Sequence, residues 1–322
     1  MHPICLCFST GRSGTTFLAH TLTATYHPEV DVFHEDISEF QSKPRCYLWS
    51  LDERDFAPMR KNPIIAAHLA RVQERSALRP YVDVGHTVTP LVPLLLATFP
   101  GRLRLLHLVR DPVEASASMA VRGMYHPRYE GMEGPAYNLP PDPCQTRCAH
   151  PEYASRWQVM TPFEKNLWRW GEYHLLAMAI HERNPEVPYL RLPSENLFKD
   201  QSCSRIIADF FGLPKRDIVA QPTYRNETHP NLTSSISIGD EWRRYVEYAY
   251  ILDLATLLGV PVQQDGLDKK MKKYAAPTAW QIAKYRWKVR LTPQWWARKL
   301  RQVGVMPHPE RKRVGREVRT HC

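Results

Sequence analysis

The feature that most constrains the fold of this chain is a short apolar run that ends in a glycine-rich turn and continues as a helix. Residues 4–8 are apolar, the turn contains Gly11 and Gly14, and residues 17–22 have helical spacing. A strand that turns through glycines into a helix aims several backbone N–H groups, and the positive end of the helix dipole, at one point. The segment therefore predicts a binding site for an anion such as a phosphate.

Further short apolar runs recur along the chain, and helical patterns separate most of them. These runs lie at residues 30–33, 81–84, 103–109 and 187–190. Strands that alternate with helices predict a three-layer α/β fold, in which helices cover both faces of a mostly parallel central sheet. Ligands of such sheets bind beyond the carboxyl ends of the strands. The glycine turn follows the first strand at that end.

The residues inside the turn suit a phosphate group. Arg12 offers a planar charged fork, while Ser13, Thr15 and Thr16 offer hydroxyl groups. A nucleotide kinase of the usual kind has four residues between the two glycines and a lysine after the second. Here only two residues separate the glycines, and that lysine is missing. The turn is therefore predicted to cradle phosphate in a different way.

Two segments resemble one known family. Residues 10–16, Thr-Gly-Arg-Ser-Gly-Thr-Thr, resemble the 5′-phosphosulfate loop of sulfotransferases, which holds 3′-phosphoadenosine 5′-phosphosulfate (PAPS) in that family. The family has a second motif after a later strand, an arginine with a serine eight residues on, which hold the 3′-phosphate. Arg110 and Ser118 match it, and Pro112 is typical of a helix start. Residues 190–213 are similar to a third segment, so the resemblance covers about residues 4–260.

The resemblance implies a sulfotransferase that moves a sulfuryl group from PAPS to a hydroxyl or amine acceptor, releases adenosine 3′,5′-bisphosphate and requires no metal. Arg12 is expected to neutralise the charge that develops on the leaving oxygen and on the sulfuryl group. A surface ion pair of Arg110 with Asp111 or Glu114 is the alternative for that arginine. The expected cofactor-binding residues are Gly11, Arg12, Ser13, Gly14, Thr15, Thr16, Arg110 and Ser118.

The catalytic base should follow a strand next to the phosphosulfate loop, and two places qualify. His34 and Glu35 follow the run at 30–33, while Asp83 and His86 end or follow the run at 81–84. The resemblance to the bacterial and tyrosine-modifying branches of the family favours His34 or Glu35, ahead of His86 and then Asp83. The ordinary pKa of histidine suits a base near neutral pH, whereas a glutamate needs burial to raise its pKa.

Residues 1–265 are expected to form the sulfotransferase domain. The proline-, glycine- and tyrosine-rich stretch at about 122–161 predicts a long loop over the active face. Helical periodicity at 163–180 and at 241–258 predicts two core helices. Cys144, Cys148 and His150 give only a weak zinc pattern, so an ordinary substrate-covering loop is favoured there.

Residues 266–322 are expected to form a basic, tryptophan-rich helical extension. Residues 269–322 contain 16 lysines and arginines against two acids, a net charge of +14, which leaves −4 of the total of +10 for residues 1–268. This distribution argues against nucleic acid as a partner. A helical pair docked on the body is favoured over a helix on an anionic membrane surface. The membrane interpretation would suit a carbohydrate or lipid-linked acceptor.

No export signal or membrane-spanning segment is recognisable, and the longest apolar segment, 87–99, is too short to cross a bilayer. Together with an odd number of cysteines, seven, this predicts a cytoplasmic protein, with peripheral membrane contact as an option. Two other functions stay open. One is a nucleotide or metabolite kinase on a related loop, with Asp111 as the metal-binding carboxylate, and the other is a non-catalytic protein that binds membrane surfaces.

Overall fold

The computed structural model describes residues 1–37, 53–126, 143, 147–199, 201–219 and 236–274. The chain divides into two units between Ala276 and Pro277. All of the described residues belong to the first unit, so most of the predicted basic extension lies outside them.

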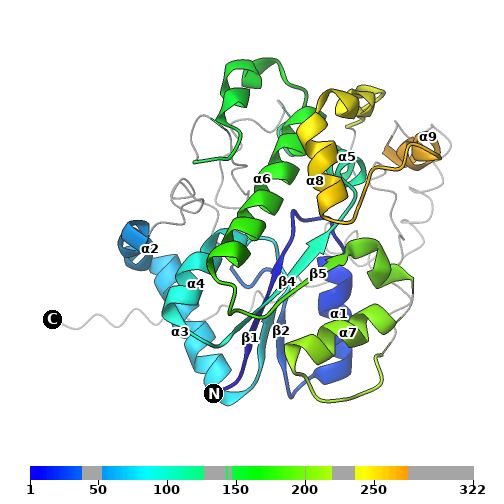
Figure 1. Cartoon of the computed structure of the whole chain (residues 1–322). Helices are drawn as coiled ribbons and strands as arrows, with labels where there is room; N and C mark the ends of the chain where they lie inside the picture. The colour runs from blue at the N-terminus through cyan, green and yellow to red at the C-terminus, as the bar shows by residue number, and fades with distance from the viewer. Residues whose placement is uncertain (38–52, 127–142, 144–146, 200, 220–235, 275–322) are drawn as a thin grey trace, which may run out of the picture. The chain divides into compact units, whose positions relative to one another are not determined.

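Five parallel strands form one sheet in the order β2-β3-β1-β4-β5 (Figure 1). The strands are β1 (Ile4–Phe8), β2 (Asp31–Phe33), β3 (Tyr81–Asp83), β4 (Leu103–Val109) and β5 (Tyr189–Pro193). All five residues of β1 are buried, as expected for a central strand whose two faces are both covered. The predicted parallel sheet is confirmed.

Helices follow the strands and form the outer layers. The α-helices are α1 (Thr15–Tyr26), α2 (Phe56–Lys61), α3 (Pro63–Leu78), α4 (Val92–Thr98), α5 (Pro112–Ala120), α6 (Pro162–Arg183), α7 (Ser202–Phe211), α8 (Ala249–Leu257) and α9 (Leu267–Met271). Several begin at a proline, whose fixed φ suits the first helical turn. Thr161 caps α6 in a reciprocal arrangement with Glu164, which fixes where this longest helix starts.

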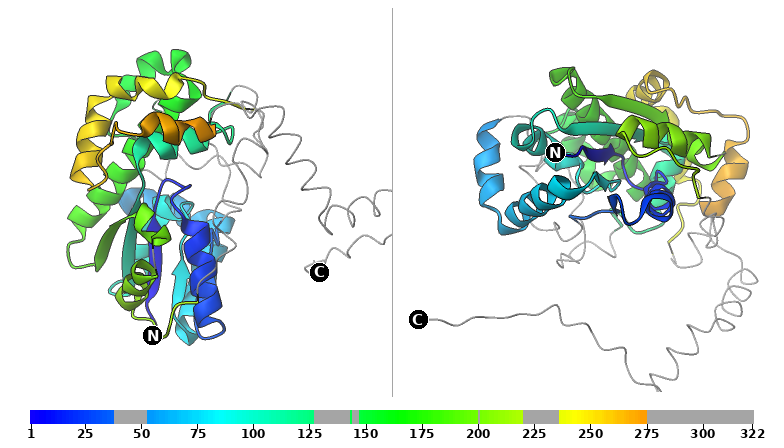
Figure 2. Two further views of the ribbon diagram at one scale, coloured as in Figure 1. Left: turned by 90° about the vertical axis from the view of Figure 1, so that its right-hand side faces the viewer. Right: turned by 90° about the horizontal axis from the view of Figure 1, so that it is seen from below.

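Alternate residues of β1 point into different layers. Ile4 and Leu6 pack with α3, α4 and α6, whereas Cys5 and Cys7 pack with α1 and α7. Figures 1 and 2 show α3 and α4 on one side of the sheet and α1 and α7 on the other. A third apolar cluster joins α5, α6, α8 and α9. The predicted three-layer α/β fold is therefore confirmed.

The structure departs from the single helix predicted at 241–258. A 3-10 helix spans Glu241–Glu247, and α8 begins at Ala249, with Tyr248 between the two. Tyr248 is 1% exposed and its hydroxyl donates to Glu164 Oε1 at 2.7 Å. Holding this ring in the core fixes its backbone at φ −110° and ψ 66°, outside the helical region, so the helix is interrupted there.

The described part of the predicted loop at 122–161 is more regular than expected. Pro151–Val159 forms a 3-10 helix with Trp157 buried, and Glu172 of α6 accepts the backbone N–H groups of Ala149 and His150 at 2.7 and 2.9 Å. Among the residues that the structure describes, no three His, Cys, Asp or Glu side chains gather as metal ligands. Cys144, one of the three zinc candidates, lies outside them.

The segment after residue 266 begins with ordered structure that packs on the body. Leu267 and Met271 of α9, and Tyr274 of the following 3-10 helix (Lys272–Tyr274), are buried in the cluster around α5. None of the described helices combines the length and the apolarity that crossing a bilayer requires.

Candidate functional site

The glycine turn joins β1 to α1 at the carboxyl end of the sheet. Gly11 and Gly14 have φ values of +79° and +81°, and Arg12 between them has a φ of +58°. A Cβ atom at Gly14 would lie 2.8 Å from Cζ of Phe198, so the Phe198 ring would have to shift, and a side chain would also strain the backbone at this positive φ. The predicted tight turn is thus present, and the positive φ is the main reason for a glycine at position 14.

Hydrogen bonds within the turn fix its shape. The Gly11 N–H donates to Ser9 Oγ at 3.2 Å, and the hydroxyl of Ser13 donates to the Gly11 carbonyl at 3.3 Å. Gly14 is the N-cap residue of α1 and has no side chain to accept the first N–H groups of the helix. This is the arrangement that an anion can complete.

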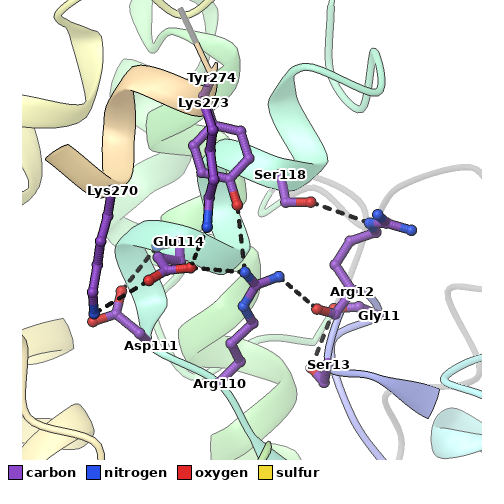
Figure 3. Close-up of polar contacts among 10 residues, drawn as sticks. All are labelled: Gly11, Arg12, Ser13, Arg110, Asp111, Glu114, Ser118, Lys270, Lys273 and Tyr274. Atoms are coloured by element: carbon purple, nitrogen blue, oxygen red, sulfur yellow. Dashed lines mark hydrogen bonds and ion pairs between the residues drawn. The ribbon is translucent and has the colours of Figure 1, made fainter. Parts of the chain in front are cut away.

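The two sequence motifs meet in space, although about a hundred residues separate them (Figure 3). Arg12 Nε donates to Ser118 Oγ at 3.1 Å, and Arg110 Nη1 donates to the carbonyl of Arg12 at 2.7 Å. Arg110 follows β4, and Asp111 caps α5 by accepting the N–H of Glu114 at 2.9 Å. Ser118 therefore lies two turns along α5, as predicted, and faces the glycine turn.

Glu114 connects Arg110 to the segment that follows residue 266. Its carboxylate accepts from Arg110 Nη2 and Lys273 Nζ, each at 2.8 Å, and lies 3.3 Å from Lys270 Nζ (Figure 3). Burial raises the pKa of Glu114, but Arg110 and Lys273 outweigh it and lower the pKa to about 2. Arg110 also donates to the hydroxyl of Tyr274 at 3.4 Å.

Sequence reasoning partly missed this cluster. It considered an ion pair between Arg110 and Glu114, which the structure contains, but it placed that pair at the surface, whereas the Glu114 side chain is 9% exposed. It assigned Lys270 and Lys273 to the basic extension only. Their spacing of three residues was the one available signal, and it does not say which carboxylate the two lysines contact.

Positive charge predominates around the turn. Burial, together with the charges of Arg122 and Arg110, lowers the pKa of Arg12 to about 10, so this guanidinium stays charged near neutral pH. The charges of Tyr274 and Glu114 offset the effect of burial on Arg110 and raise its pKa. Because two lysines share Glu114 with Arg110, the cluster has more cations than carboxylates.

The four candidate bases also lie together, next to the turn. His86 Nδ1 is 2.7 Å from Glu35 Oε1, and the backbone N–H of Glu35 donates to Asp83 Oδ1 at 3.1 Å. His34 Nε2 lies 3.1 Å from the hydroxyls of both Thr15 and Thr16. A Cβ atom at Gly11 would lie 3.4 Å from His86 Nδ1, which places the His86 ring against the glycine turn.

The backbone of Glu35 packs closely against that of Gly85. Glu35 has a φ of +63°, and a Cβ atom at Gly85 would lie 2.5 Å from the backbone nitrogen of Glu35. The Gly85 N–H donates to the same Asp83 oxygen at 2.9 Å. The Asp83 carboxylate thus accepts hydrogen bonds from the backbone N–H groups of both Glu35 and Gly85 and holds the two segments together.

The surroundings set different ionisation states for these groups. Full burial, with the charge of Asp36, raises the pKa of Asp83 to about 7 against the backbone N–H bonds that lower it. Burial also raises the pKa of Glu35, but His86, His34 and Arg169 more than offset it, so the pKa is lowered. Burial lowers the pKa of His34. Glu35 is therefore the ionised carboxylate of this group, and it faces His86.

The fold and the glycine turn define an α/β protein with a P-loop-like strand–loop–helix. No family model and no curated protein matches the chain. Its structure is similar to a sulfotransferase from Alicyclobacillus acidocaldarius (12% identity, 81% of this chain and 98% of that chain, TM-score 0.44). It is also similar to the sulfotransferase domain of the Synechococcus PCC 7002 olefin synthase (17%, 75% and 87%, 0.41) and to mouse sulfotransferase SULT7A1 complexed with PAP (13%, 85% and 89%, 0.36). These three TM-scores lie below 0.5.

Proposed function

We propose that this chain is a sulfotransferase that moves a sulfuryl group from PAPS to a hydroxyl or amine acceptor. The observation that carries the proposal is the meeting of the two motifs. Arg12 contacts Ser118 at 3.1 Å, and Arg110 contacts the Arg12 carbonyl at 2.7 Å. One predicted anion-binding group lies in the glycine turn and the other at the start of α5. The side chains of Arg12 and Arg110 connect the two. A nucleotide with phosphate groups at both its 5′ and 3′ positions suits that arrangement.

The residues present fit PAPS. The start of α1 and the hydroxyls of Thr15 and Thr16 would hold the 5′-phosphosulfate, while Arg110 and Ser118 would hold the 3′-phosphate. The turn from Ser9 to Thr16 contains no carboxylate, and Glu114, the acid beside Arg110, is already held by Lys270 and Lys273. An incoming phosphate thus meets net positive charge rather than repulsion.

Arg12 is the residue that we assign to charge stabilisation. Its guanidinium remains charged near neutral pH and reaches from the turn to Ser118 on α5. When bound, PAPS supplies an activated sulfuryl group, whose S–O bond to the 5′-phosphate breaks as the acceptor atom bonds to sulfur, with the electron pair leaving on the phosphate. A fixed cation at that place stabilises the negative charge that develops without any reorganisation.

His86 is the residue that we assign as the proton acceptor, with Glu35 as its partner. Nδ1 of His86 lies 2.7 Å from the Glu35 carboxylate, and we assign this imidazole to taking up the acceptor proton. The ionised Glu35 then stabilises the imidazolium. His34 has its Nε2 at the hydroxyls of Thr15 and Thr16, so we assign it to holding the turn. Asp83, which accepts backbone N–H groups, holds Glu35 in place.

The kinase alternative finds less support at this site. Asp111, the carboxylate that could bind a metal ion, accepts the N–H of Glu114 and caps α5. The interpretation as a membrane-surface protein rests on the basic extension, and residues 275–322 lie outside the described part of the chain.

Calorimetry of adenosine 3′,5′-bisphosphate tests the proposal, with Mg²⁺–ATP as the competing ligand. We expect metal-independent micromolar binding that Arg110→Ala weakens by about 1.5–3 kcal/mol, the range for a hydrogen bond to a charged group. Arg191→Ala, on the edge strand β5, is the matched control and should bind as the wild type does. Preference for Mg²⁺–ATP would favour the kinase, and binding of neither ligand would favour the non-catalytic protein.

A further inference from the structure

The buried side chain of Arg169 reaches the glycine turn from α6, on the other side of the sheet from α1. It is 3% exposed, and its Nη1 donates to the carbonyl of Thr10 at 2.7 Å. The guanidinium lies over the ring of Tyr173, 4.3 Å from its centroid. Its Nε is buried and has no hydrogen-bond partner in the part of the chain that the structure describes.

Arg169 differs from several other arginines, which contact carboxylates. Arg71 contacts Asp36, Arg110 contacts Glu114 and Arg244 contacts Glu164. Within the described ranges, no carboxylate lies within ion-pair distance of Arg169. Burying a guanidinium that makes no ion pair is costly, and proteins typically keep such a buried charge where function requires it.

The position of the guanidinium connects both halves of the site. The carbonyl that it holds belongs to Thr10, next to Gly11 with its φ of +79°, and Gly11 lies against the ring of His86. The same nitrogen of His86, Nδ1, lies 2.7 Å from Oε1 of Glu35. Arg169 thus fixes the Thr10–Gly11 peptide. This peptide belongs to the turn that would hold the phosphosulfate, and it lies against His86, which with Glu35 would take the proton.

We infer that Arg169 is a positioning residue of the transfer site, which fixes the Thr10–Gly11 peptide and provides a permanent positive charge beside Glu35 and His86. The catalytic part of this inference rests on the proposed function. The hydrogen bond orients the peptide at the start of the turn. The charge keeps Glu35 ionised, so that the carboxylate is ready to pair with His86 when His86 takes up a proton.

The charges that face Glu35 allow this effect to be tested directly. His86 and His34 lie on its own side of the site, Asp83 accepts its backbone N–H, and Arg169 on α6 adds a positive charge that lowers its pKa. Burial raises the pKa of Glu35, and Arg169 is one of the cations that outweigh that effect. Loss of the Arg169 charge should therefore raise the titration midpoint of Glu35, whereas a purely structural role would leave it in place.

The experiment follows the Glu35 side-chain carboxyl by NMR in full-length protein with ¹³C-labelled glutamate, with Glu35→Gln to assign the resonance. In Arg169→Gln, which removes the charge, we expect the midpoint to rise by about 0.5–1 pH unit, below the effect of a charge in direct contact. In Arg169→Lys, which keeps the charge, it should stay near the wild-type value. Arg183→Gln, about 21 Å further along the same helix, is the control.

An unchanged midpoint in Arg169→Gln, or equal shifts in the Gln and Lys variants, would overturn the inference. If Arg169→Gln does not fold, amide exchange in Arg169→Lys decides the question. Loss of the guanidinium bond should then speed exchange at Gly11 and Arg12 by about threefold or more, as expected for one weakened hydrogen bond. Unchanged exchange would contradict the inference. Since neither measurement needs PAPS, their failure is distinct from failure of the calorimetric test.

Discussion

The molecule contains two pairs of histidines that differ in what surrounds them. His34 and His86 lie at the carboxyl end of the sheet, beside Glu35 and the hydroxyls that start α1. His107 and His174 lie in the body, 0% and 1% exposed, with His107 Nε2 at 2.7 Å from His174 Nδ1. Both pairs have rings at hydrogen-bond distance from polar atoms, yet only the first pair faces a carboxylate.

The surroundings decide what each pair can do. Burial, with the charges of Arg191 and His181, lowers the pKa of His107 to about 3, and burial lowers that of His174 well below its ordinary value. Tyr189 contacts His107, and the ring of Trp170 meets His174 edge to face. These imidazoles stay neutral and serve packing. A carboxylate next to the ring allows an imidazole to take up and release a proton. The first pair of histidines has such a neighbour, and the buried pair does not.

The largest expected effect concerns His86. His86→Ala should slow release of adenosine 3′,5′-bisphosphate from PAPS by about 10²–10⁴-fold, the usual contribution of a general base, in assays with a panel of hydroxyl and amine acceptors. The free energy of unfolding should change little, and the affinity for adenosine 3′,5′-bisphosphate should stay within about threefold, because the ring lies beside the predicted phosphate site rather than in it. A variant with unimpaired turnover would remove His86 as the base.

The opposite pattern is expected for the core pair. His174→Ala should lower the free energy of unfolding by about 2–4 kcal/mol, since it leaves a cavity and removes the partner of His107 Nε2. Calorimetry should find the nucleotide affinity unchanged. Urea unfolding followed by circular dichroism measures the first quantity. A large loss of affinity in a variant that unfolds normally would show that the two pairs are not separate.

Acid should destabilise the protein through the same core pair. A histidine whose pKa is lowered in the folded state contributes stability that is present above its unfolded pKa, near 6.5, and is lost as the pH falls toward its folded value. For His107 that window runs from about 6.5 down to about 3. Between pH 6.5 and 5 the loss should be at most about 2 kcal/mol for each histidine. His107→Phe should flatten this part of the urea midpoint curve, and an equally steep curve would contradict the assignment.

The smallest expected effect concerns Asp83, whose contribution to stability changes with pH in the direction opposite to that of His107. Its pKa is raised to about 7, so its contribution is fully present below about pH 4 and is lost as the pH rises through 7. Asp83→Asn keeps an oxygen for the N–H groups of Glu35 and Gly85 but does not titrate. We expect it to be about 1 kcal/mol more stable than the wild type at pH 8 and no more stable at pH 4. Equal stability at both values would mean that Asp83 does not titrate in this range.

The sequence alone determined the order of the strands and helices and the position of the glycine turn. Period-two and period-3.6 patterns are local, so the alternating strands and helices, the parallel sheet and the turn with Gly11 and Gly14 could be predicted. The motif of Arg110 and Ser118 was accessible because the two lie close in sequence, Arg110 two residues before α5 and Ser118 on it. Candidate bases could be named since each follows a strand that ends at the same edge.

Only the tertiary structure decided which of those groups meet. Glu35 pairs with His86 rather than with its neighbour His34, because β2 lies beside β3 and Asp83 holds the Glu35 backbone. Arg169 reaches Thr10 across 159 positions of sequence, and Lys273 reaches Glu114 across the same separation. Such contacts depend on how α6 and α9 pack on the sheet and on α5. Packing of that kind sums many weak contacts between distant residues, which no local pattern in the sequence records.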